Sequence, residues 1–205
     1  YNLTGNGVLV NSLMEVGSAG YGTFRQTGGT FQGVDVRLGA APAGNGELAL
    51  SDGTFSTTGT VTVGDEGTGT VTWSGGSFQA RMTEIGPSGT FVTEGDRTLH
   101  VTLAVTGGTV QANGTLSLTD SAFIDMGKGT LDAPDLRVGH LGAGGVVQRS
   151  GHVAIDALTL ASGSALAMGG YTLEDGALSA ASAAIAKDGI GQFTASGGTF
   201  SIDTA

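Results

Sequence analysis

Apolar and polar residues alternate along this chain in short stretches that are separated by glycine. In one such stretch Leu48 and Leu50 are apolar, with the small residue Ala49 between them. Alternation with a period of two is typical of a β-strand that buries one face. The same pattern recurs along the chain at Tyr1/Leu3, Val71/Trp73, Leu103/Val105, Ile124/Met126 and Tyr171/Leu173.

Each of these strands leads into a glycine corner and a further apolar residue, which together form an eight-residue motif. The motif reads apolar, any residue, apolar or Gln, Ser/Thr, Gly, Gly, Thr/Ser, apolar. Its cleanest copies are FRQTGGTF at 24–31, VTWSGGSF at 71–78 and FTASGGTF at 193–200. A short apolar stretch that closes with glycine, such as Leu38-Gly39, follows roughly ten residues later. A repeat of roughly 22 residues with short strands and glycine turns is the signature of a solenoid.

The sequence therefore predicts an all-β fold, a single-stranded right-handed parallel β-helix (β-solenoid) with about eight or nine coils of roughly 22 residues. We expect one domain over residues 1–205. The repeat spacing is disturbed between Glu94 and Leu103, so an irregular coil is expected near 91–103. The alanine-rich stretch 177–186 is interpreted as a further coil, not a helix, because Leu178 and Ile185 keep the phase of the repeat.

The residue that closes each motif should stack from coil to coil as one buried apolar ladder. The expected members are Phe31, Phe55, Phe78, Val110, Leu131, Val153, Leu178 and Phe200. Glycine pairs fit tight corners, where a positive φ is cheap only for glycine. The expected turn glycines are Gly28, Gly29, Gly75, Gly76, Gly107, Gly108, Gly197 and Gly198.

Composition narrows the classes of function. Glycine supplies 39 of 205 residues, yet it does not occur at every third position, which excludes collagen. Cysteine is absent, which excludes a disulfide scaffold and thiolate metal sites. A net charge of −10 with only 8 Lys and Arg argues against nucleic acid as a partner. We expect no membrane span in this chain and no cofactor, although an acidic surface could collect calcium loosely.

Three segments resemble the glycine-rich β-strand repeats of bacterial surface proteins, including autotransporter passenger domains and large exoproteins. These segments are Tyr1 to Gly5, Gly22 to Thr30, and Gly189 to Phe200. The resemblance implies an extracellular location on the bacterial cell surface and a structural or adhesive role. The membrane barrel of an autotransporter and a sorting tail are not in this sequence.

Carboxylates are the strongest candidates for chemistry. Polysaccharide hydrolysis needs two carboxylates at a defined separation, and lyase chemistry needs a base, usually with calcium or arginine. Most acids here fall in turns, where Asp is favoured for backbone reasons. We therefore interpret them as solvated turn residues and assign no catalytic, cofactor-binding or metal-binding residue. The candidates weighed are Asp120 with Asp125, Asp132 with Asp135, Asp65 with Glu66, and the group Glu94, Asp96 and Arg97.

Hydroxyl and imidazole side chains give a weaker signal. A column of Thr and Ser suits the exposed face of stacked strands. An ice- or crystal-matching face would need paired Thr columns, and only Thr60/Thr62 and Thr70/Thr72 look paired. The three histidines belong to different repeats without a metal-binding spacing, and His152 is expected to be exposed in the hydroxyl column. That column comprises Thr30, Thr54, Ser77, Thr109, Thr130 and Thr199, and the other two histidines are His100 and His140.

The sequence thus favours an extracellular structural protein of a bacterial surface fibre, layer, sheath or adhesin stalk, and not an enzyme. Its expected partners are further copies of itself, stacked head to tail, or neighbouring solenoid segments. The alternative is a polysaccharide lyase, a hydrolase or a carbohydrate-binding β-helix, with a surface polysaccharide as partner, because solenoids host such activities. A groove with two acids and an exposed aromatic ring would favour the alternative.

Overall fold

A computed structural model describes residues 1–202 and confirms the predicted fold class. The chain is an all-β parallel β-solenoid with about 9 turns of roughly 22 residues, and the described residues contain no helix. The alanine-rich stretch is a strand, as expected. The chain forms two compact units, which are described separately. Unit 1 comprises 1–94 and 106–110, and unit 2 comprises 95–105 and 111–205, so the division falls close to the segment of disturbed repeat spacing.

Unit 1 contains the first nine strands of the chain. They are β1 (Asn2–Leu3), β2 (Val8–Val16), β3 (Tyr21–Leu38), β4 (Asn45–Thr57), β5 (Thr60–Val63), β6 (Thr68–Trp73), β7 (Ser77–Gln79), β8 (Met82–Ile85) and β9 (Gly89–Thr93). A short strand, β12 (Thr109–Ala112), includes residues of both units.

Unit 2 contains the remaining strands. They are β10 (Arg97–Leu99), β11 (Thr102–Val105), β13 (Thr115–Leu118), β14 (Ala122–Met126), β15 (Thr130–His140), β16 (Ala143–Gln148), β17 (His152–Ser162), β18 (Met168–Leu173), β19 (Ala177–Ile185), β20 (Ile190–Ala195) and β21 (Thr199–Ile202).

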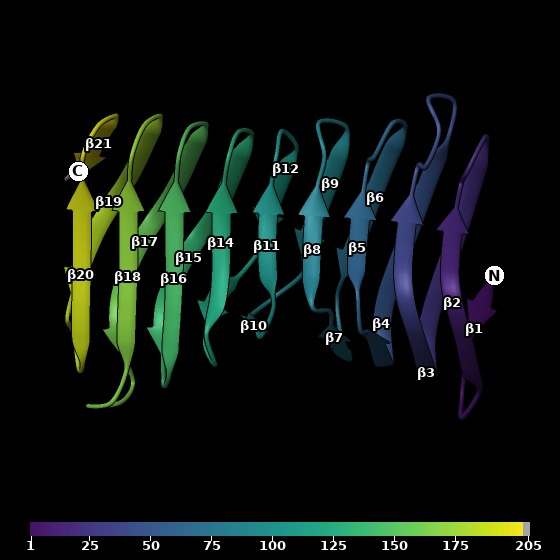
Figure 1. Ribbon diagram of the computed structural model, residues 1–205. Coiled ribbons are helices and arrows are strands. Elements are labelled where there is room, and N and C mark those ends of the chain that lie inside the picture. The colour runs from purple at the N-terminus through teal and green to yellow at the C-terminus, as the bar shows by residue number, and fades with distance from the viewer. Residues whose placement is uncertain (203–205) are drawn as a thin grey trace. The chain divides into compact units, whose positions relative to one another are not determined.

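Each coil of unit 2 has three straight segments, which stack as three sides. Side A consists of β11, β14, β16, β18 and β20, paired in parallel and lying side by side (Figure 1). Side B consists of the first halves of β15, β17 and β19 with β21. Side C consists of the second halves of those three long strands with β13 and β10. The register skips Pro134, between sides B and C.

Unit 1 repeats this arrangement. Its side A joins β1, β3, β4, β6 and β9, its side B joins β2, β3, β4 and β7, and its side C joins β2, β3, β5 and β8. All of these pairings are parallel, so equivalent residues of successive coils lie next to each other.

The apolar ladder of unit 1 is built from phenylalanine rings on side B. Phe31, Phe55 and Phe78 are register partners and are 0, 0 and 3 % exposed. The ring centroids of Phe31 and Phe55 lie 4.7 Å apart at 14°, and those of Phe55 and Phe78 lie 5.2 Å apart at 6°. Val110 is also fully buried, but its strand β12 pairs with β9 of side A, so it does not continue the phenylalanine ladder as expected. In-register stacking therefore fills the core of this unit with parallel rings.

In unit 2 the ladder is aliphatic. Leu131, Val153 and Leu178 are register partners, and all three are buried. Phe200 pairs with Leu178 but is 36 % exposed, so the expectation that it is buried was wrong. The reason is geometric, because no described strand pairs with the other edge of β21.

The glycine corners require glycine for two different reasons. Gly28, Gly29, Gly76 and Gly198 have positive φ, but Gly75, Gly107, Gly108 and Gly197 do not. At Gly29, with φ of 70°, the left-handed backbone itself requires glycine. At Gly75 the constraint is space, since a Cβ would lie 2.1 Å from the carbonyl oxygen of Ser51 in the preceding coil. Glycine is thus required at these corners by backbone conformation at some positions and by space at others.

Polar side chains at the third motif position secure these corners from inside. Gln26 Nε2 donates a hydrogen bond to the Gly29 carbonyl at 3.1 Å, and Gln148 Nε2 donates to the Gly151 carbonyl at 3.2 Å. In unit 2 the Tyr171 hydroxyl also donates to Gln148 Oε1 at 2.6 Å. Burial raises the pKa of Tyr171. These bonds satisfy the Nε2 groups of Gln26 and Gln148 and the Tyr171 hydroxyl, which would otherwise destabilise a dry core, whereas Gln26 Oε1 has no hydrogen-bond partner among the described residues.

Candidate functional site

The carboxylate of Asp96 accepts a hydrogen bond from the backbone of a turn. None of the contacts described for Asp96 is with a second carboxylate. Asp96 Oδ1 accepts a hydrogen bond from the backbone N–H of Thr115 at 2.8 Å. That bond, and then the Thr115 hydroxyl, lower the pKa of Asp96, with smaller help from the charges of Arg137 and Arg97. The ionised carboxylate of Asp96 therefore stabilises the backbone at Thr115. Glu94 belongs to unit 1, where its N–H donates to the Trp73 carbonyl at 2.9 Å.

The pair Asp120 and Asp125 is separated by its own partners. Asp120 Oδ2 lies 2.9 Å from His100 Nδ1, and both side chains are largely exposed. Asp125 instead forms an ion pair with Arg149 on the next coil, which also approaches Glu174 at 3.8 Å. Asp120 has a φ of 52°, unusual for a residue other than glycine. Each carboxylate therefore has its own polar partner, and the two do not approach each other as a catalytic pair.

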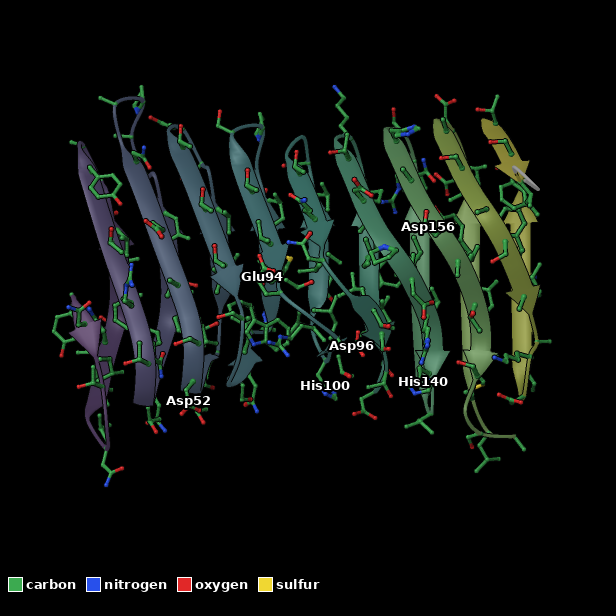
Figure 2. The ribbon with its side chains drawn as sticks, turned by 180° about the vertical axis from the view of Figure 1, so that it is seen from behind. Asp52, Glu94, Asp96, His100, His140 and Asp156 are labelled. Atoms are coloured by element: carbon green, nitrogen blue, oxygen red, sulfur yellow. The ribbon has the colours of Figure 1, made fainter. Side chains whose placement is uncertain are left out.

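The pair Asp132 and Asp135 is also divided, across the corner at Pro134. Asp135 Oδ2 accepts hydrogen bonds from Arg137 Nε at 2.8 Å and from the Thr115 hydroxyl at 3.5 Å. Asp132 is exposed and lines a shallow depression of about 350 Å³ with Asp156. Figure 2 shows Asp156 in the upper part of unit 2, away from His140 near the lower edge.

The other candidates remain on the surface. Asp65 and Glu66 are exposed in the turn after β5. His152 is exposed and pairs with Thr130, as expected for the hydroxyl column. Thr30, Thr54 and Ser77 of the hydroxyl column are register partners on side B, whereas Thr62 on side C lies between Arg37 and Glu84 and so has no threonine beside it. An ice-matching face needs uninterrupted Thr rows, so the structure gives this interpretation no support.

Sequence reasoning missed a polar groove on side C of unit 2. It has a volume of about 400 Å³ and lies where Asp135 and Arg137 on β15 face the small residues Ala157 and Thr159 on β17. Its far wall is Lys187 with Asp188, whose Oδ2 accepts a hydrogen bond from Gly163 N–H at 2.8 Å. In the sequence, the groove corresponds to one repeat position at which the long Arg137 is followed by the shorter Thr159 and Ala184 in the next two coils.

The same groove contains a contact between a serine hydroxyl and a histidine ring, the residue types that can serve as nucleophile and base. His140 Nδ1 lies 3.1 Å from Ser162 Oγ, and the two residues are register partners on adjacent coils. Ser162 is only 5 % exposed, so its hydroxyl is poorly placed to attack a substrate. The contact is therefore explained as a cross-strand hydrogen bond.

The described residues contain no group of three or more His, Cys, Asp or Glu side chains that could hold a metal ion. The described residues form no helix, and therefore no helix that could span a membrane. Comparisons with protein-family models, with curated proteins and with solved structures found no match.

Proposed function

We propose that this chain is an extracellular structural protein of a bacterial surface fibre, layer, sheath or adhesin stalk. The observation that supports the proposal is that inward and outward side chains differ in their roles. Every coil contributes inward residues to a dry, in-register core, whereas the outward carboxylates are exposed in turns, hydrogen-bonded to backbone or paired with cations. Such an arrangement supplies stiffness and solubility without a reactive centre.

The likeness to glycine-rich repeats of bacterial surface proteins supports the location. Repeats of autotransporter passenger domains and large exoproteins have the same glycine-punctuated strands. Hydrogen-bonded stacking also stabilises a coil without disulfides, and this chain has no cysteine. The partners that this proposal implies are further copies of the chain or neighbouring solenoid segments.

The test is to locate the protein on the bacterium that produces it. Intact cells would be treated with a protease that cannot enter them, and an antibody to the chain would be used for electron microscopy. We expect loss of the protein on protease treatment and label on an ordered external structure. Protection in intact cells, with label only inside, would overturn the proposal.

The polar groove on side C favours one alternative, a carbohydrate-binding or polysaccharide-active β-helix. Arg137, His140 and Lys187 offer hydrogen-bond donors to an acidic sugar, and Asp135 and Asp188 offer acceptors. Binding of polygalacturonate that is lost in Arg137→Ala and unchanged in Arg149→Ala would support it. Arg149 is the matched control because it lies on the same unit outside the groove.

A further inference from the structure

Two asparagines in interior coils are each followed by glycine, and the structure treats these two pairs differently. They are Asn45-Gly46 in unit 1 and Asn113-Gly114 in unit 2. In such a pair the backbone nitrogen of the glycine can attack Cγ of the asparagine, because glycine has no side chain to obstruct the approach. The backbone must rotate at the asparagine for these two atoms to meet, so the local freedom of the backbone decides which pair reacts.

The backbone of Asn45-Gly46 is held in a sheet. Asn45 begins β4, and its N–H donates a hydrogen bond to the Gly20 carbonyl at 2.9 Å. Gly46 is buried, and its register partners are Gly22 on one neighbouring strand and Gly69 on the other. Rotation at Asn45 therefore requires this part of β4 to leave the sheet.

Asn113-Gly114 instead forms the bend between β12 and β13. Asn113 is exposed, as Asn45 is, so the two pairs differ in their backbone and not in access to water. The N–H of Gly114 has no hydrogen-bond acceptor among residues 1–202. A Cβ on Gly114 would lie 2.4 Å from the carbonyl carbon of Gly95 in the preceding coil. The fold thus requires glycine at the position where the reaction also requires it.

A side-chain donor lies at the atom where negative charge develops in this reaction. Gln111 Nε2 donates a hydrogen bond to Asn113 Oδ1 at 3.3 Å. When the Gly114 nitrogen adds to Cγ, this oxygen carries the negative charge of the tetrahedral intermediate. A donor placed at such an oxygen stabilises the intermediate, so Gln111 favours the reaction at Asn113.

We infer that Asn113-Gly114 is a modification site, at which the chain reacts with itself and then with water. The Gly114 nitrogen forms a bond to Cγ of Asn113, the Cγ–Nδ2 bond breaks, and the amide nitrogen leaves as ammonia with the proton of the attacking N–H. Water then opens the cyclic imide at one of its two carbonyl carbons and leaves aspartate or isoaspartate at position 113. No atom is oxidised or reduced. Either product adds one negative charge to the net charge of −10. This inference goes beyond the structural role and does not rest on it.

The isoaspartate product alters the turn beside Asp96. The N–H of Thr115, two residues after Asn113, donates a hydrogen bond to Asp96 Oδ1 at 2.8 Å. Isoaspartate adds one carbon to the main chain immediately before Gly114, which is packed closely against the preceding coil. The amide of Thr115 should therefore lose protection from hydrogen exchange in the isoaspartate form.

The test compares the two pairs in the folded protein and in the chain unfolded in urea. Both samples are incubated in mildly alkaline buffer, and each pair is followed by peptide mapping with mass spectrometry and by labelling with an isoaspartate-specific methyltransferase. In urea the two pairs should react at similar rates, because the dipeptide is the same. In the folded protein Asn113 should react at least about tenfold faster than Asn45, whose strand must first open.

Gln111→Glu is the matched variant for the donor, because it keeps the length of the side chain and replaces the Nε2 donor with an acceptor. It should slow the reaction at Asn113 by about two- to tenfold, the value of one hydrogen bond, and leave Asn45 unchanged. Asn113→Gln should fold, lack the modification and keep the protection of the Thr115 amide during the incubation.

Each outcome decides the inference. A preference for Asn113 that appears only in the folded protein supports it. Equal rates at Asn113 and Asn45 in the folded protein would overturn it, as would an Asn113 that stays intact for as long as the unfolded chain needs to react. An unchanged rate in Gln111→Glu would overturn the role given to Gln111. The cell-surface experiment succeeds or fails independently of these results.

Discussion

Truncation of one ring in the phenylalanine ladder tests the packing on which the fold depends. Phe55 is fully buried between two parallel rings, those of Phe31 and Phe78, with centroids at 4.7 and 5.2 Å. Phe55→Ala removes the ring from water-free surroundings and leaves a cavity that two flanking coils cannot close without losing strand register. Buried Phe to Ala substitutions destabilise by about 3–5 kcal/mol. Because the site is enclosed on both sides, we expect the upper half of that range.

The measurement is urea unfolding followed by tryptophan fluorescence. Trp73 is the only tryptophan, is 5 % exposed, and lies 5.7 Å from the Phe78 ring, so it reports unit 1 directly. Tyr21→Ala is the control in the same unit, since Tyr21 is 73 % exposed. A surface substitution of this kind changes stability by about 0.5 kcal/mol or less. Equal losses for Phe55→Ala and Tyr21→Ala would refute the reasoning that in-register ring stacking stabilises the coil.

Four further substitutions in unit 2 are predicted to change stability by smaller amounts. Gly170→Thr should stabilise by about 0.5–1 kcal/mol in urea unfolding, because a Cβ there meets nothing within 4 Å and Thr suits a strand. The neighbouring Gly169→Ala should destabilise, since its Cβ would lie 2.1 Å from the Val138 carbonyl oxygen. Ala186→Gly should stabilise by about 1 kcal/mol, because Ala186 is exposed and has a φ of 56°. Tyr171→Phe should cost about 1–3 kcal/mol at neutral pH by breaking a buried hydrogen bond. Since burial raises the pKa of Tyr171, the wild-type unfolding free energy should fall as the pH rises above the ordinary tyrosine value of about 10, and Tyr171→Phe should lack that part of the fall.

The ladder and the coil count could be predicted because both depend on local patterns. An apolar residue two positions after a glycine pair, repeated at one spacing, determines which side chains stack, and Phe31, Phe55 and Phe78 follow that rule. The corners were harder to predict. Ala186 occupies a left-handed corner that Gly139 occupies two coils earlier, and alanine has no sequence signature for that conformation.

The partners of the charged side chains could not be predicted for a different reason. Asp125 pairs with Arg149 of the next coil, and the Thr115 hydroxyl of one coil donates to Asp135 of the next. Pairing between coils depends on an exact count of residues around every intervening corner, and the corners vary in length by several residues. A carboxylate pair in the sequence therefore carries little information about a pair in space. The groove beside Lys187 has the same origin, because its walls come from different coils.

Inward and outward positions of the coils in unit 2 differ in how far their residues vary. Outward neighbours change chemical type, as in the series Arg137, Thr159 and Ala184. Inward neighbours stay apolar, as in the series Leu131, Val153 and Leu178, all of which are buried. Stacking in the core therefore constrains side-chain type along its column, whereas the outward column carries no such constraint.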